Sequence, residues 1–402
     1  MSYPSLSRIV LETIDLYSSH TDLPRIDLTQ FHTPLVVGSN NGYSTGRILF
    51  RNTPAYFAVE SEVDSKLENI PSITDVVIVS ASGEKHAPII LEAAKKYGKK
   101  TLLISSSKSS TGRSMADHSI IMPKIREPYT YNTSTYFGYM LAETPDIDLV
   151  KLREFLTGEL SHALSFRTEW NEVRNPARNH TSLLSFSEGE SDSVITSWAR
   201  NFSVSEDSEQ DVPTRGILPI SHSLDMTDSS HLSFRAEAVA EVEKSHSDED
   251  LPTRGILTIS TSVEMTGSID FSQFSSFFLV IPDEFVLLRE MFEVKFIELF
   301  GRKVARDIFS YEQMKHATTV VQDSGELFLC FGNDTWVVYG EHQINLPIFD
   351  TKWYAAMMLV GYYVIGLIQE SLPPYFADSI EDYCVRAKAL SGFDIKAWVE
   401  VW

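Results

Sequence analysis

DVVIVSASGEKHAPIILEAAKKYGKKTLLIS, residues 75–105, is the stretch that decides the fold of this chain. Residues 75–79 are a short β-branched apolar run, and residues 101–104 are a second one. Between them, residues 86–97 show the apolar spacing of a helix, with Gly98 in the position where helices commonly end. Strand, helix and strand in this order are typical of a parallel sheet covered by helices. The stretch therefore predicts an α/β fold.

The same alternation continues on both sides of this stretch. We expect further strands at residues 34–37, 55–63 and 119–122, and helices at residues 45–50 and from Tyr136 to Leu141. Hydroxyl-rich loops follow the strands, at residues 38–45, 80–85, 105–111 and 132–135. Ligands of doubly wound parallel sheets bind outside the carboxyl ends of the strands. These loops are therefore the predicted binding region.

Composition limits the classes of partner. A chain of 402 residues with 43% hydrophobic residues is long enough for two domains. Its net charge of −21 argues against a nucleic acid, whereas a small phosphate can be held by backbone N–H groups and hydroxyls. The two cysteines form neither a metal motif nor a disulfide framework, which fits a reducing compartment. We expect a cytoplasmic protein without metal or cofactor.

Two stretches bear on membranes and secretion. The amphipathic N-terminus has no basic first region, no long apolar stretch and no small-residue cleavage site, so we expect no signal peptide. The most apolar run, residues 353–368, is short for a membrane span and contains Gly361 and Gly366. We interpret it as a buried core helix and expect no membrane contact.

Residues 181–268 differ from the rest in composition, being rich in Ser and Thr with 16 acidic residues against 5 basic ones. They contain a repeat: residues 211–227 and 250–266 start 39 residues apart and are identical at 12 of 17 positions. One interpretation is a disordered acidic insert with a duplicated segment. The other is a pair of β-forming peptides that dock on a protein partner by strand addition.

The second half of the chain contains a possible acid–base pair. Apolar helical spacing from Phe285 leads to Lys295 and Glu298, and a strand at residues 304–309 separates them from His316. Further strands are expected at residues 277–281 and 326–331, with possible pairing by 336–339. A Glu facing a cleft can move a proton between carbons. Alternatively, Glu298 pairs with Arg302 in solvent and His316 is structural.

The loop at residues 80–85 has two interpretations as well. Ser80, Ser82 and the N–H groups of the following helix could cradle a phosphate without many basic residues. The simpler possibility is that one serine only caps the helix. The chain contains neither a Walker loop nor a G-x-G-x-x-G nucleotide motif.

These motifs resemble those of the double sugar isomerase (SIS) domain family. Residues 76–105 are similar to the first half of an SIS domain, with its strand, S-x-S-G-E/D-T loop and helix ending in A-K-x-x-G. Residues 60–62, 116–118 and 132–135 resemble further landmarks of that domain. Residues 292–317 are similar to the second SIS domain of the isomerase part of glucosamine-6-phosphate synthase and its archaeal relatives.

The resemblance implies two flavodoxin-like parallel-sheet domains, a phosphorylated sugar as ligand and a homodimer. It places Glu298 as the base that moves a proton through an enediol, and Lys295 of the same Lys-x-x-Glu motif as a further catalytic residue. It gives His316 a part in ring opening, often supplied by the other subunit. The residues it implies for phosphate and sugar binding are Asn40, Asn41, Ser80, Ala81, Ser82, Lys85, Thr133 and Ser134.

We therefore predict a phosphosugar aldose–ketose isomerase, with a non-catalytic sugar-phosphate sensor or scaffold as the alternative. The expected organisation is a helix within residues 1–30, a first SIS domain at 31–175, the acidic insert at 176–270 and a shortened second SIS domain at 271–402. Lys85 stands where the family usually has Thr, and residues 376–380 replace the C-terminal segment whose Lys serves the synthases. We do not expect glutamine-dependent amination.

Overall fold

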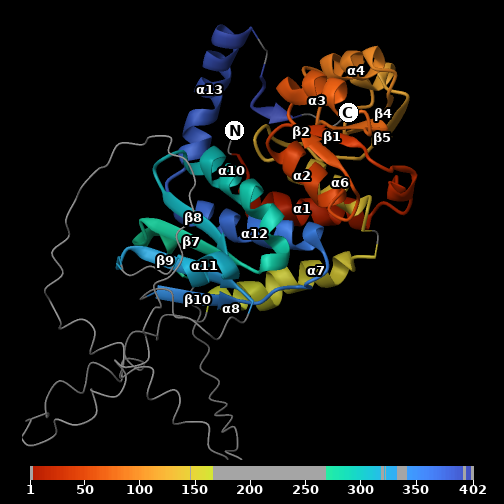
Figure 1. The fold of residues 1–402 in the computed structure, drawn as a ribbon. Helices are drawn as coiled ribbons and strands as arrows, with labels where there is room; N and C mark the ends of the chain where they lie inside the picture. The colour runs from red at the N-terminus through yellow and green to blue at the C-terminus, as the bar shows by residue number, and fades with distance from the viewer. Residues whose placement is uncertain are drawn as a thin grey trace, which may run out of the picture. The chain divides into compact units, whose positions relative to one another are not determined.

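The computed structural model describes residues 3–144, 146–165, 269–317, 321, 323–332, 342–392 and 395–399. Their helices and strands are labelled in Figure 1. The described residues on both sides of the insert belong to one compact unit. Both repeats and the possible strand at 336–339 lie outside the described residues, so the predictions about them stay predictions.

The first sheet has five parallel strands in the order β2-β1-β3-β4-β5. They are β2 (Tyr56–Ala58), β1 (Leu35–Gly38), β3 (Asp75–Val79), β4 (Lys100–Ser105) and β5 (His118–Ile121). This is the flavodoxin-like order. Ile78 lies opposite Val37 on one side and Leu103 on the other, at the centre of the sheet. The predicted fold class is confirmed.

Helices cover both faces of this sheet because every strand has apolar residues on both sides. Val37 and Ile78 face a cluster that includes α3 (Val63–Asn69) and α4 (Ala87–Lys96), with the short α5 (Thr111–Met115) beside α4. Val77 and Ile104 face the other way, toward α2 (Asn41–Leu49) and α6 (Thr133–Leu141). Figure 1 shows the two layers of helices around the sheet.

The second sheet has four parallel strands in the order β10-β9-β7-β8. They are β10 (His342–Leu346), β9 (Glu326–Phe331), β7 (Ser276–Ile281) and β8 (Ala305–Ser310). Numbered along this half of the chain, their order is 4-3-1-2, the flavodoxin-like order without its fifth strand. The doubly wound second half predicted from the sequence is therefore present.

The two faces of the second sheet pack against different helices. Phe277 and Leu279 belong to the main core with α10 (Arg289–Phe300) and α12 (Tyr354–Ser371). Phe278 and Val280 form a smaller cluster with Met314 of α11 (Tyr311–His316). The strand alternation thus places α10 and α11 on opposite faces of this sheet.

The remaining elements connect the two sheets or finish their edges. They are α1 (Leu6–Ser18), η1 (Leu28–Gln30), η2 (Glu60–Glu62), β6 (Glu127–Pro128), α7 (Leu149–Phe155), the π-helical turn η3 (Leu156–Leu160), α8 (Ser161–Ser165), η5 (Phe271–Gln273), η6 (Asp283–Leu288), α13 (Tyr375–Ser391) and β11 (Trp398–Val399).

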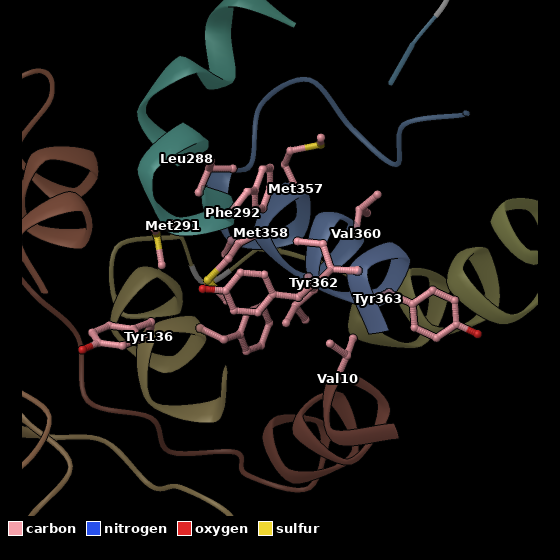
Figure 2. Close-up of a cluster of buried hydrophobic side chains, with 14 of the residues drawn as sticks. Val10, Tyr136, Leu288, Met291, Phe292, Met357, Met358, Val360, Tyr362 and Tyr363 are labelled. Carbon is pink, nitrogen blue, oxygen red and sulfur yellow. The ribbon is translucent and has the colours of Figure 1, made fainter. Parts of the chain in front are cut away.

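The predicted buried core helix is confirmed as α12, whose interior positions are apolar on all sides and buried. Figure 2 shows its side chains meeting those of α1, α6 and α10. A Cβ on Gly361 would lie 2.3 Å from the Phe292 ring, and one on Gly366 would lie 2.1 Å from the Ser7 nitrogen. The two glycines therefore allow α10 and α1 to approach α12 closely.

Among the described helices, no single one is long and apolar enough to cross a membrane. Only α12 and α13 taken together reach that length and apolarity, with a bend of 99° between them.

Several predicted boundaries were wrong. The strand at 55–63 ends at Ala58, and α3 begins at Val63. The Glu62 carboxylate accepts a hydrogen bond from the Val59 N–H at 3.0 Å, which favours a helical turn there. The apolar pattern from Phe285 begins as the 3₁₀ helix η6 and becomes α-helical only at Arg289.

The chain crosses between the two sheets more than once. α1 packs on both α6 and α12, and α8 packs against β10. The C-terminal β11 pairs with β6, which follows the first sheet. The two halves are therefore interlocked, and the domain limits proposed from the sequence stay a prediction.

The two ends of the 166–268 segment meet at one point of the fold. The Ile269 N–H donates a hydrogen bond to the Leu164 carbonyl at 3.3 Å. Chain segments whose ends already touch can be shortened with little effect on the rest of the structure.

We therefore expect that replacing residues 166–268 by a short Gly-Ser linker leaves the melting temperature unchanged, as measured by calorimetry. A longer deletion that also removes α7 and α8 is the matched control. It should lower the melting temperature, because Phe155 of α7 packs on Phe349. Equal loss of stability in the two deletions would contradict the prediction.

Candidate functional site

The site begins at the carboxyl ends of β1 and β3, which are neighbours in the first sheet. Asn41 starts α2 directly after β1, and its Oδ1 atom is buried with no hydrogen-bond partner among the described residues. A Cβ on Gly42 would lie 2.7 Å from the Val79 carbonyl oxygen. Asn40, at a φ of 46°, turns the chain toward this contact. Asn40 and Asn41 thus lie beside the loop after β3.

The loop after β3 contains the serines predicted to bind phosphate. Ser80 Oγ accepts a hydrogen bond from the Gly83 N–H at 3.1 Å, and Ser82 Oγ accepts one from the Glu84 N–H at 3.3 Å. Both bonds stay inside the loop, and α4 has no side-chain cap. The serines therefore do not act as helix caps. Ser82 and Lys85 are exposed, and Ala81 is half-buried.

The next loop along the sheet is joined to this one. The Ser106 N–H bonds to the Ala81 carbonyl at 3.3 Å. The Ser106 hydroxyl donates to the Tyr139 hydroxyl at 3.3 Å, which itself donates to the Ser80 carbonyl at 3.4 Å. Tyr139, on α6, is fully buried. Its hydroxyl therefore joins the loop after β3 to the loop after β4 by hydrogen bonds.

Thr133 and Ser134 begin α6 and are fully buried. Their backbone N–H groups donate to the two carboxylate oxygens of Glu127 at 2.8 and 3.2 Å, and the Ser134 hydroxyl donates to Glu127 at 2.6 Å. These donors of the helix N-terminus are therefore occupied by a side chain of the protein itself. A ligand contact by Thr133 or Ser134 stays a prediction.

Glu127 is a buried carboxylate, only 1% exposed. Burial raises its pKa, while the hydrogen bonds of Ser134 and Thr133 and the charge of Lys295 act in the opposite direction. Sequence reasoning missed this residue. The contact depends on Asn132 in the left-handed conformation, at a φ of 46°, which turns α6 back onto Glu127. No spacing of residues in the sequence signals it.

Lys295 is fully buried, and all three of its N–H donors are used. It donates to the Thr130 carbonyl at 2.5 Å, the Tyr131 carbonyl at 2.8 Å and the Glu298 carboxylate at 2.8 Å. Its ammonium group also lies 5.1 Å from the centre of the Tyr362 ring. Lys295 therefore positions Glu298 and the turn before α6, and has no donor left for a substrate.

Glu298 is partly buried, with 27% of its side chain exposed, and pairs with Lys295. The predicted alternative, a solvent pair with Arg302, does not form. Burial raises the pKa of Tyr136 and Tyr362, and the charge of Glu298 raises it further; burial and then the charges of Tyr383 and Glu298 raise that of Tyr129. Through Lys295, Glu298 is tied to the turn that leads into α6.

His316 does not lie near Glu298. Its side chain is 79% exposed, and its Nε2 atom is 3.2 Å from a carboxylate oxygen of Glu312. It belongs to α11, on the face of the second sheet opposite to α10. A single chain therefore does not bring His316 to Glu298, and its role in catalysis stays a prediction that requires a second subunit.

No group of three or more His, Cys, Asp or Glu residues among the described ones could hold a metal ion. The fold and the site together define an α/β protein with two flavodoxin-like sheets, hydroxyl loops at the strand ends of the first sheet and a carboxylate on α10 tied through Lys295 to the turn before α6.

No protein-family model and no curated protein match this chain. Similar solved structures include glucosamine-6-phosphate deaminase from Thermotoga maritima, with a TM-score of 0.49, 12% identity and coverage of 92% of this chain and 97% of that chain. Tagatose-6-phosphate ketose/aldose isomerase from Escherichia coli has a TM-score of 0.42, 9% identity and coverage of 92% and 89%. The C-terminal domain of glucosamine-fructose-6-phosphate aminotransferase from Francisella tularensis has a TM-score of 0.40, 10% identity and coverage of 91% and 91%.

Glu127→Gln tests the cap on α6. The amide keeps the shape of the side chain but turns a donor toward a backbone N–H, so we expect a loss of about 1–3 kcal/mol in the free energy of unfolding, measured with urea.

This loss should depend on pH in a defined direction. The folded-state pKa of Glu127 is raised above the unfolded value near 4.5, so its stabilising contribution is fully present below that pH and is lost as the pH rises through the folded-state pKa. The variant has no such group. The advantage of the wild type should therefore shrink as the pH rises, and an advantage that grows with pH would contradict this account.

Proposed function

We propose that this chain is a phosphosugar aldose–ketose isomerase that uses Glu298 as its base. The observation that carries the proposal is that both parts of the site are tied to α6. Tyr139 of α6 bonds to the Ser80 carbonyl at 3.4 Å, and Lys295 links the Glu298 carboxylate to the Thr130 and Tyr131 carbonyls in the turn that leads into α6. A phosphate on the loops would place the sugar carbons toward Glu298.

The reaction needs one positioned base. Glu298 removes the proton from C2, the C–H electron pair forms the C=C bond, and the carbonyl π pair moves to O1. A proton passes from the C2 hydroxyl to O1, and the O–H electron pair left on O2 forms the new C2=O bond while the C=C pair takes the proton that Glu298 returns to C1. Two carbons exchange oxidation state, so no cofactor is required. Lys295 holds the carboxylate in place.

The phosphate would bind at the loop after β3. The hydroxyls of Ser80 and Ser82 have accepted hydrogen bonds, yet neither O–H group has an acceptor among the described residues. Together with the uncapped N-terminus of α4, they offer donors for an anion. The sequence resemblance to the SIS phosphate loop supports the same assignment.

A second function is favoured by one observation. His316 and Glu298 lie on opposite faces of the second sheet, so a single chain lacks the expected ring-opening group. The alternative is a sensor or scaffold that binds a sugar phosphate without converting it. A homodimer that brings in His316 from its partner would remove this objection, and the oligomeric state is therefore part of the proposal.

Glu298→Gln should reduce isomerisation by about 10²–10⁴-fold while leaving sugar-phosphate binding intact, because only the base is lost. The measurement is the exchange of the C2 proton of hexose 6-phosphates with deuterated solvent, followed by NMR. Glu293→Gln is the matched control, since Glu293 lies on the same helix and pairs with Arg289 at 2.9 Å. Undiminished exchange in Glu298→Gln would exclude Glu298 as the base. Binding without exchange in the wild type would favour the sensor.

Ser82→Ala should raise KM for hexose 6-phosphates by about 10–100-fold, the value of one hydrogen bond to a charged group. It should also reduce thermal stabilisation by inorganic phosphate. Ser65→Ala serves as the control, because Ser65 is exposed on α3 and is not part of the loop after β3. An unchanged KM and an unchanged thermal shift would mean that phosphate binds elsewhere.

A further inference from the structure

Lys124 lies in the loop that follows β5, the strand at one edge of the first sheet (Figure 1). The residue is only 9% exposed. Unlike Lys295, it forms no hydrogen bond or ion pair with any residue that the structure describes. Its nitrogen is not among the fully enclosed polar atoms that lack a partner, so the ammonium group still reaches solvent. Lys124 is therefore a nearly enclosed cation whose charged end is accessible.

The burial of Lys124 has a cost that no described residue offsets. A charged side chain is removed from water at a large cost unless another group pairs with it. Burial lowers the pKa of the Lys124 ammonium, and the charge of Glu127 acts in the opposite direction. Glu127 forms no bond to it, because its carboxylate oxygens accept from Thr133 and Ser134. An anion bound to Lys124 would compensate its charge.

The backbone on both sides of Lys124 is fixed by hydrogen bonds. The Met122 N–H donates to the Ser105 carbonyl at 2.9 Å, which ties the loop to the end of β4. The Ile125 N–H donates to the Ser134 hydroxyl oxygen at 3.2 Å, which ties the loop to the first turn of α6. Lys124 therefore extends from a loop held at both ends, on the edge of the sheet where ligands of doubly wound folds bind.

Ser107 provides a second accessible polar group on the neighbouring strand end. It follows β4 by two residues, whereas Lys124 follows β5 by three. The last residues of these strands, Ser105 and Ile121, lie opposite each other in the sheet, at a strand spacing of about 4.8 Å. Ser107 is 8% exposed, and its hydroxyl has no partner within the described ranges and is not fully enclosed. A hydroxyl and an ammonium group thus stand at adjacent strand ends.

This pair of groups has the chemistry of a phosphate site. An ammonium group offers three N–H donors and a hydroxyl offers one, and hydrogen bonds to an ionised acceptor are the stronger ones. A neutral ligand would leave the charge of Lys124 uncompensated, and a cation would be repelled by it. A phosphate group carries enough oxygens to accept from both residues.

We propose that Lys124 and Ser107 form an anion-binding subsite that takes a phosphate group at the carboxyl ends of β4 and β5. The subsite goes beyond the proposed function, because it does not depend on turnover and lies two strands from the loop that contains Ser82. Two strand spacings are about 10 Å, close to the separation of the two phosphates in a hexose bisphosphate. The ligand class is therefore a sugar bisphosphate, with one phosphate at Ser82 and the other at Lys124.

Lys124→Met keeps the length of the side chain and removes its charge. We expect the affinity for fructose 1,6-bisphosphate to fall by about 10–100-fold, as loss of hydrogen bonds between charged groups does. Isothermal titration calorimetry measures this affinity. Lys100→Met is the matched control, because Lys100 is exposed at the opposite, amino end of β4. Its affinity should equal that of the wild type, and an equal affinity in Lys124→Met would overturn the proposal.

Stability without ligand provides a readout that a structural lysine would move in the other direction. Because the Lys124 ammonium is buried without a partner, the ligand-free Lys124→Met protein should melt at the wild-type temperature or above it. Fructose 1,6-bisphosphate should raise the melting temperature of the wild type more than that of the variant. A variant that melts lower but responds fully to the bisphosphate would show that Lys124 is structural.

Ser107→Ala tests the second group of the subsite and removes only a hydroxyl. It should weaken binding of fructose 1,6-bisphosphate by about 10-fold. Full affinity in both Lys124→Met and Ser107→Ala, or no binding to the wild type, would exclude the subsite.

The outcomes also separate this proposal from the isomerase. Bisphosphate binding that depends on Lys124, without exchange of the C2 proton of hexose 6-phosphates, would keep the subsite and exclude the isomerase. Proton exchange together with bisphosphate binding that does not depend on Lys124 would do the reverse.

Discussion

The buried ammonium group of Lys295 is the interaction on which the candidate site depends. A charge removed from water is tolerated only when it is paired and fully hydrogen-bonded. Lys295 meets this condition by binding the Thr130 and Tyr131 carbonyls and the Glu298 carboxylate at once. Helix α10, which carries Glu298, is therefore tied to the turn that leads into α6. The same helix α6 carries Tyr139, whose hydroxyl bonds to the Ser80 carbonyl in the loop after β3.

Glu127 secures the same turn from its other end. Its carboxylate accepts from the first two N–H groups of α6, and the charge of Lys295 reaches it through the protein interior. Two buried groups, the Glu127 carboxyl and the Lys295 ammonium, thus enclose a turn whose backbone supplies polar atoms to both. Removing either would leave buried donors or acceptors without partners, which costs more than an exposed ion pair gains. The position of α6 is therefore specified by buried hydrogen bonds as well as by apolar packing.

Much of the fold could be predicted from local sequence because the strands are short apolar runs and the helices between them have a clear period. Residues 75–79 and 326–331 were predicted at the limits that β3 and β9 have. Limits failed where a local side-chain bond decides the conformation, as at Glu62. Of the candidate site, the serine loops and Glu298 could be named from their motifs. Glu127 and Tyr139 could not, because Glu127 bonds across a turn and Tyr139 bonds to a loop that is distant in sequence.

The sequence by itself determined the α/β class and the loops at the strand ends, since these follow from hydrophobic period and residue type, while Glu298 was named from the resemblance of its motif. Only the tertiary structure decided which of the candidate residues meet. It placed Glu298 next to α6 and His316 on the other face of the second sheet, because alternate residues of a strand point to opposite faces and the helices pack accordingly. It also brought Leu164 to Ile269, so that the fold continues across a segment of more than a hundred residues.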